Sequence, residues 1–246
     1  MTTFLTNEAL EAVRQHPPGL ELVRYWRRTA EASSESANVL LSYLASNLLQ
    51  RGWIQPADKV LDAAVETLNE PRDKLQAAWN ELVASDLVKL DTDGQRVTTI
   101  AGILATRPTG LLYYLDIEHQ VHLSGPLAGL AVAQALQKKG EVRAACAHDK
   151  GKRLAMGCDT SGIFSRKPES IAMFLPAWDG TTSAAAAMAG GGFFADDDAL
   201  GLWQEGKGDP AGMPLASFMF PMAATDLGQE LGAALERILN HLPDFS

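Results

Sequence analysis

The chain has 246 residues, enough for one large domain or two small ones with an ordinary hydrophobic core. Hydrophobic residues make up 46% and charged residues 21%, which is typical of a soluble globular protein. The net charge of −9 argues against nucleic-acid binding as the main task, because that affinity comes from basic side chains that neutralise phosphates. The two cysteines, Cys146 and Cys158, exclude a disulfide scaffold and a four-cysteine zinc site within one chain.

The negative charge is concentrated at the C-terminal end. Residues 168–246 carry 2 basic and 11 acidic residues, whereas residues 138–167 carry 8 basic and 3 acidic ones. The opposite charges of these two segments could pair with each other as readily as with another molecule. The first residues have acids and no apolar core of a secretory signal, and no apolar run reaches about 18 residues. We expect a cytoplasmic protein with reduced thiols and no membrane partner.

The first 106 residues predict a helical, winged-helix-like domain. Apolar residues at helical spacing indicate helices over 36–52, 56–68 and 70–83, and two strands at 87–90 and 96–100 flank a turn. The third helix would be the recognition helix of a DNA-binding module. Its charged residues sum to −1, so the sequence favours a structural or interaction module, and nucleic acid is an unfavoured partner. The residues are Glu70, Arg72, Asp73, Lys74 and Glu81.

Residues 107–246 predict an α+β domain with a mixed, mostly antiparallel sheet. Apolar strand patterns and turn residues divide this part into alternating strands and helices. The predicted strands cover 111–116, 121–123, 141–147, 153–158, 171–175, 190–195 and 215–220, and the predicted helices cover 126–140, a short stretch after the cap at 196–198, and 226–242.

Three scattered segments of this second half share their order with a known family. They are Ser161–Pro168 with the strand Ile171–Pro176, Phe193–Ala195 with Trp203 after it, and Leu227–Glu230 with Leu235 and Leu239 downstream. In this order, from about Tyr113 to Leu239, the chain resembles the alkylmercury (organomercurial) lyases. The resemblance implies a helical, winged-helix-like N-terminal region and a sheet-rich catalytic domain.

Alignment with this family also indicates that the chain lacks the family's catalytic residues. The family cleaves carbon–mercury bonds with two thiolates and a carboxylate, because soft sulfur ligands suit this metal. The alignment places Gly125 and Ala128 where the first cysteine and the aspartate belong, and Met188 or a small neighbour where the second cysteine belongs. Cys146 falls near a further family cysteine that is structural. We therefore expect a divergent member without classical organomercurial lyase activity.

The small residues at the family's catalytic positions would enlarge the pocket there, so that it could hold a bulkier organic ligand. The apolar lining expected from the resemblance consists of Gly125, Ala128, Met188, Phe193, Phe194 and Trp178. His122 and Ser124, two residues apart, would share one strand face and serve as catalytic acid–base and hydrogen-bonding groups. The alternative is a partly buried histidine bonded to a backbone carbonyl.

Other candidate sites are weaker. Glu118 and His122 would need a helix to bind a metal together, and the strand pattern removes that geometry, so no metal site is predicted. Cys146 and Cys158 lie on the two arms of one predicted hairpin, which leaves a cross-strand pair open. Two buried thiols that pack as small hydrophobes are the favoured interpretation over a redox or soft-metal pair.

The sequence therefore favours a lyase-type or related enzyme of specialised metabolism that acts on an organic small molecule. A non-catalytic ligand-binding or scaffold protein and a ligand-responsive winged-helix regulator are the alternatives. The sequence does not indicate a cofactor. The glycine run at 190–192 is not a phosphate loop, because it lacks the Lys-Ser/Thr that follows such glycines. The sequence also leaves open whether the protein forms a homodimer.

Overall fold

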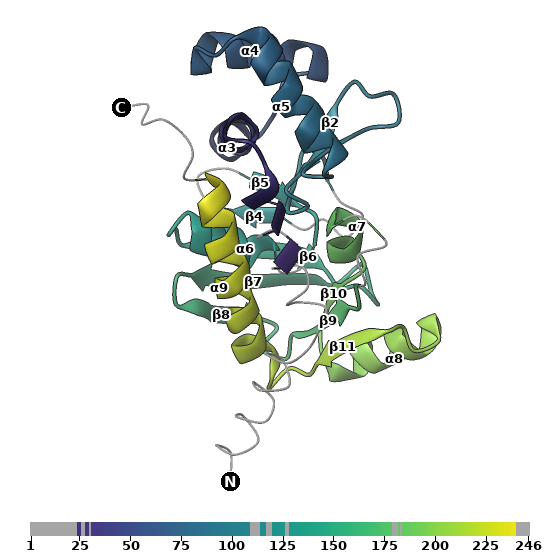
Figure 1. The fold of residues 1–246 in the computed structure, drawn as a ribbon. Helices are drawn as coiled ribbons and strands as arrows, with labels where there is room; N and C mark the ends of the chain where they lie inside the picture. Colours follow the sequence, from purple (N-terminus) through teal and green to yellow (C-terminus); the bar gives the residue numbers. More distant parts are fainter. Residues whose placement is uncertain are drawn as a thin grey trace.

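The computed structural model describes residues 24–25, 28–29, 31–108, 114–116, 120–125, 128–178, 182 and 184–239 (Figure 1). The first half of the strand predicted over 111–116 and the end of the helix predicted over 226–242 lie outside these ranges. Within them, helices combine with antiparallel sheets, so the predicted α+β class is confirmed. No helix in the described ranges is long and apolar enough to cross a bilayer.

Three helices and a two-stranded hairpin form the first part, as predicted. The helices are α3 (Glu35–Arg51), α4 (Ala57–Leu68) and α5 (Arg72–Ala84), and the strands are β1 (Val88–Leu90) and β2 (Val97–Ile100). The N-cap of α3 is Ser34, whose Oγ accepts a hydrogen bond from the backbone of Ala37. The same serine donates to the carboxylate of Glu81, which ties the start of α3 to α5.

One eight-stranded antiparallel sheet runs through most of the molecule. Its order is β1-β2-β3-β5-β4-β6-β7-β8. The strands after the hairpin are β3 (Leu104–Ala105), β4 (Tyr114–Asp116), β5 (Gln120–Leu123), β6 (Gly140–Ala145), β7 (Arg153–Asp159) and β8 (Gly162–Lys167). Leu104 pairs with Leu123, so β3 joins the N-terminal hairpin to the C-terminal strands. The boundary predicted at 106/107 thus falls inside a continuous sheet.

Two helices pack on one face of this sheet. These helices are α6 (Ala128–Ala135) and α9 (Phe220–Leu239) (Figure 1). Gly129 of α6 lies against the side chains of Leu123 and Val142, and Gly228 of α9 lies against Leu130. Helix α6 ends earlier than the predicted residue 140, because Gln137 adopts a positive φ of 52°. The sheet and the helices share one hydrophobic core.

A second, three-stranded sheet has the order β10-β9-β11. It contains β9 (Ala172–Pro176), β10 (Gly192–Phe194) and β11 (Gly212–Leu215), with the helices α7 (Ala184–Ala189) and α8 (Asp197–Lys207) in the connections. The carbonyl of Phe193 accepts a hydrogen bond from the backbone of Ala147, which links this sheet to the chain after β6.

The strand predicted over 215–220 is wrong. Strand β11 already ends at Leu215, and α9 begins at Phe220, six residues before the predicted start. The backbone N–H groups of Met219 and Phe220 both donate to the carbonyl of Ala216, which closes a turn there. Pro221 then suits the first turn of a helix, because that position requires no hydrogen bond from its nitrogen.

Candidate functional site

His122 lies in β5, opposite Ala105 and Tyr114 in the sheet register. Its side chain is half-buried, and this burial lowers the pKa of the imidazole below its usual range. The ring is therefore neutral near pH 7. Its Nδ1 atom is buried and has no hydrogen-bond partner among the described residues. A buried polar atom without a partner is uncommon, so this nitrogen calls for a ligand or a water molecule.

Ser124 is buried directly after β5, and its hydroxyl faces the protein backbone. It donates toward the carbonyl oxygens of Gly102 and Ile103, and its oxygen lies 3.0 Å from the latter. The backbone N–H of Ser124 also donates to Ile103, at 2.9 Å. These contacts fasten the end of β5 to the segment that follows β2. The catalytic role predicted for Ser124 gains no support from this arrangement.

The pocket positions Gly125 and Ala128 lie at the junction between β5 and α6. Both are buried, and the backbone N–H of Ala128 donates to the carbonyl of Gly125 at 3.3 Å. Leu123 faces α6, where it would meet a Cβ placed on Gly129. Because neighbouring strand residues point to opposite faces, His122 points away from α6. The structure thus separates the predicted acid–base group from these two small residues.

The predicted aromatic lining is also divided. The ring of Phe193 lies 5.7 Å from that of Phe220 in α9, whereas the ring of Phe194 lies 5.2 Å from that of Trp203 in α8. The two rings therefore point to opposite faces of β10 and pack in the core.

Trp178 follows β9, and its Nε1 donates to the carbonyl of Thr182 at 3.0 Å. Its ring meets Tyr25 edge-on at 5.2 Å. Met188 belongs to α7, and its side chain lies outside the described part of the structure.

The two thiols lie at opposite ends of the hairpin formed by β6 and β7. Cys158 pairs with Gly140 at one end, while the backbone of Cys146 bonds to Lys152 beside the turn at the other. Six residues of strand separate them, which corresponds to about 20 Å. The cross-strand pair that the sequence left open is therefore excluded, and both cysteines are free and buried. Burial, with a smaller contribution from Asp159, raises the pKa of the Cys158 thiol to about 12.

No group of three His, Cys, Asp or Glu side chains that could hold a metal occurs among the described residues. The acidic run after β10 has structural roles instead. Asp196 caps α8 by accepting a hydrogen bond from the backbone of Ala199 at 2.8 Å. The carboxylate of Asp197 accepts two hydrogen bonds from Ser217, at 2.7 and 2.9 Å.

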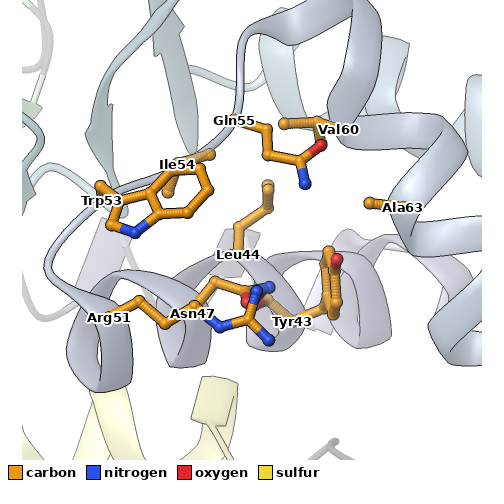
Figure 2. A pocket seen from close by; sticks show the side chains of 9 residues that line it. All are labelled: Tyr43, Leu44, Asn47, Arg51, Trp53, Ile54, Gln55, Val60 and Ala63. Atoms are coloured by element: carbon orange, nitrogen blue, oxygen red, sulfur yellow. Dashed lines mark hydrogen bonds between the residues drawn. The ribbon is translucent and has the colours of Figure 1, made fainter.

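A pocket that the sequence did not reveal lies between α3, α4 and the segment that joins them (Figure 2). The pocket is open to solvent, and the empty space in and above it is about 280 Å³. The sequence feature that marks this pocket is Trp53, an exposed tryptophan directly after Gly52, which ends α3. None of the eight predicted site residues lines it. Its lining consists of Tyr43, Leu44, Asn47, Arg51, Trp53, Ile54, Gln55, Val60 and Ala63.

Helices that cover one face of a long antiparallel sheet, with a second small sheet beside it, define a protein of the α+β class. No protein-family model matches the sequence, and no curated protein matches it. Among solved structures, the chain is similar to the crystal structure of the mercury-bound form of MerB2, an alkylmercury lyase. The TM-score is 0.70 at 12% identity, over 89% of this chain and 99% of that one. The fold relationship expected from the sequence is confirmed.

Proposed function

We propose that this protein has the alkylmercury lyase fold without its carbon–mercury chemistry, and that it binds and transforms an organic small molecule. The carrying observation is the position of its sulfur atoms. A mercury-binding pair needs two thiolates beside each other. The chain has two cysteines, and they are buried about 20 Å apart at opposite ends of one hairpin.

The acidity of the Cys158 thiol points in the same direction. A thiolate, and not a thiol, binds soft metals and attacks electrophiles. With a pKa of about 12, Cys158 carries its proton at neutral pH. Cys146 is fully buried, and its sulfur accepts a hydrogen bond from the backbone of Asp149. Both cysteines are therefore packing residues in this proposal.

His122 is the residue to which we assign the acid–base role. Its imidazole is neutral at pH 7, is partly open to solvent, and has a buried Nδ1 without a partner among the described residues. A neutral imidazole can take a proton from a bound substrate and return it later in a lyase-type reaction. The ligand would contact the sheet face that points away from α6. In this proposal Ser124 positions the end of β5.

We do not favour the DNA-regulator alternative. Both cations at the start of α5 are engaged by carboxylates, since Arg72 pairs with Asp62 and Lys74 with Glu70 at 2.9 Å. Phosphate binding would require these side chains to leave their partners. The non-catalytic binder differs from the proposed enzyme only in whether His122 moves a proton.

Native mass spectrometry of the purified protein, after exposure to a small-molecule extract of cells, tests the proposal. Wild type should retain an organic molecule that His122→Phe loses, and His122→Asn should retain the molecule without converting it. His148→Phe, at an exposed position on the neighbouring hairpin turn, is the matched control and should behave like wild type. Identical ligand content in wild type and His122→Phe would contradict the assigned site.

A further inference from the structure

The pocket between α3 and α4 has an apolar floor and one aromatic wall. Leu44 comes from α3, and Val60 and Ala63 come from α4 (Figure 2). The indole of Trp53 stands at the edge with 53% of the residue exposed. A large exposed aromatic ring beside a hollow offers a flat surface on which another ring can stack.

The pocket combines one guanidinium with neutral polar side chains that can donate or accept hydrogen bonds. Arg51 is the only formally charged residue that lines it, and no described carboxylate pairs with the guanidinium. Gln55 contributes a side-chain amide that makes no hydrogen bond within the described residues. The amide of Asn47 donates to the carbonyl of Tyr43 at 3.0 Å, which leaves its oxygen available. The pocket is therefore locally positive in a chain of net charge −9.

These features together define a ligand class. The guanidinium of Arg51, an exposed residue, can bind a carboxylate through two parallel hydrogen bonds. The tryptophan and the aliphatic floor suit a planar apolar body. The hollow is shallow and open to solvent, so a flat body of one or two fused rings would lie against Trp53 with one face exposed.

We propose that the pocket formed by α3, α4 and residues 53–55 is a binding site for a planar aromatic carboxylate, with Arg51 on the carboxylate and Trp53 against the ring. This site is separate from the His122 face, and it does not depend on the function proposed for that face. It would give the helical region of the molecule a ligand of its own.

Isothermal titration calorimetry with 2-naphthoate, and with 2-naphthamide as its uncharged counterpart, tests this assignment. Wild type should bind 2-naphthoate more tightly than 2-naphthamide. Arg51→Gln should weaken 2-naphthoate binding by roughly two- to fivefold, because an ion pair at an exposed arginine contributes modestly, and should leave 2-naphthamide binding unchanged. Trp53→Ala should weaken the binding of both compounds.

Two controls keep the test specific. Arg153→Gln removes an exposed arginine at the start of β7, outside the pocket lining, and should leave both affinities unchanged. Ala63→Leu fills the pocket and should abolish binding of both compounds, with circular dichroism to check that the variant is folded. The proposal is overturned if wild type does not bind 2-naphthoate at millimolar concentration, or if Arg51→Gln binds it as wild type does.

Discussion

Burial of the His122 side chain favours its neutral form, and this has a consequence for stability. As the pH falls through about 6.5, the unfolded chain takes up a proton at this histidine, whereas the folded chain resists protonation until a lower pH. The unfolded state then binds more protons than the native state. The free energy of unfolding should therefore decrease as the pH falls from 7 through the lowered pKa.

We expect the His122→Gln variant to lose part of this pH dependence. Urea unfolding of wild type and variant between pH 7.5 and 5 measures the difference, which should shrink as the pH falls. His148→Gln, at an exposed position, should keep the wild-type dependence. Parallel curves for wild type and His122→Gln would show that the buried imidazole does not titrate as described.

Ser124 provides a second prediction at this scale. Its hydroxyl faces two backbone carbonyls, those of Gly102 and Ile103, inside the core. Ser124→Ala leaves these oxygens without that donor, so the free energy of unfolding should fall by roughly 1–3 kcal/mol. Equilibrium denaturation measures the loss. An unchanged stability would mean that the hydroxyl is free for another role, and would restore Ser124 as a candidate catalytic residue.

At the scale of elements, the contact between α6 and α9 depends on glycine. A Cβ on Gly232 would lie 2.4 Å from the Cβ of Gln134 and 3.2 Å from the carbonyl of Ala131. A Cβ on Gly228 would lie 2.7 Å from the Cβ of Leu130. These neighbours are fixed near the backbone of α6 and cannot swing away. The two glycines, four residues apart on one helix face, allow the helices to approach closely.

Gly232→Ala should therefore destabilise the protein by about 1–3 kcal/mol, although alanine is the better helix former. The control is Gly201→Ala in α8, where nothing lies within 4 Å of the added Cβ. That variant should be stabilised by roughly 0.5–1 kcal/mol, since only helix propensity changes. Thermal and urea unfolding of both variants measure the two effects. The same sign for both would contradict the close packing of α6 and α9.

Elements with a clear periodicity were predictable from the sequence. The apolar spacing in α3, α4 and α5 and the alternation in β6 and β7 locate these elements within a few residues. The structure of Leu215–Phe220 was not predictable, because a short continuous apolar segment is equally consistent with a strand or with the approach to a helix. Strand β3, with two residues, is too short to carry a pattern.

The site was less predictable, because it depends on which face each side chain takes. Spacing suggested that His122 and Ser124 act together, but Ser124 follows the end of β5 and bonds to the backbone. Phe193 and Phe194 are adjacent in sequence and therefore point to opposite faces of β10. The separation of the cysteines depends on the hairpin register, which residue types alone do not specify.

At the scale of the whole molecule, one long sheet runs through both of the predicted domains. Strand β3 pairs with β2 on one side and with β5 on the other, and one hydrophobic core spans both parts. We expect a single cooperative unfolding transition. Tryptophan fluorescence and far-ultraviolet circular dichroism should give coincident urea curves, and two separated transitions would show that the parts fold independently.

The fold similarity and the position of the thiols together support our central proposal, an alkylmercury lyase fold without carbon–mercury chemistry. A chain can keep the architecture of an alkylmercury lyase and lose its chemistry, because function resides in the site and not in the fold. In this chain the two sulfur atoms lie too far apart to bind one mercury ion. The fold was accessible from scattered sequence similarity, whereas the separation of the two thiols depends on the hairpin register.

The most direct test is an organomercurial protonolysis assay. The purified protein is incubated with phenylmercury acetate and excess small-molecule thiol, and released benzene is measured by gas chromatography. The account predicts no release above that of a protein-free control. Repeated turnover that disappears in Cys146→Ser or Cys158→Ser would contradict it, because the buried and separated thiols would then be the catalytic ones.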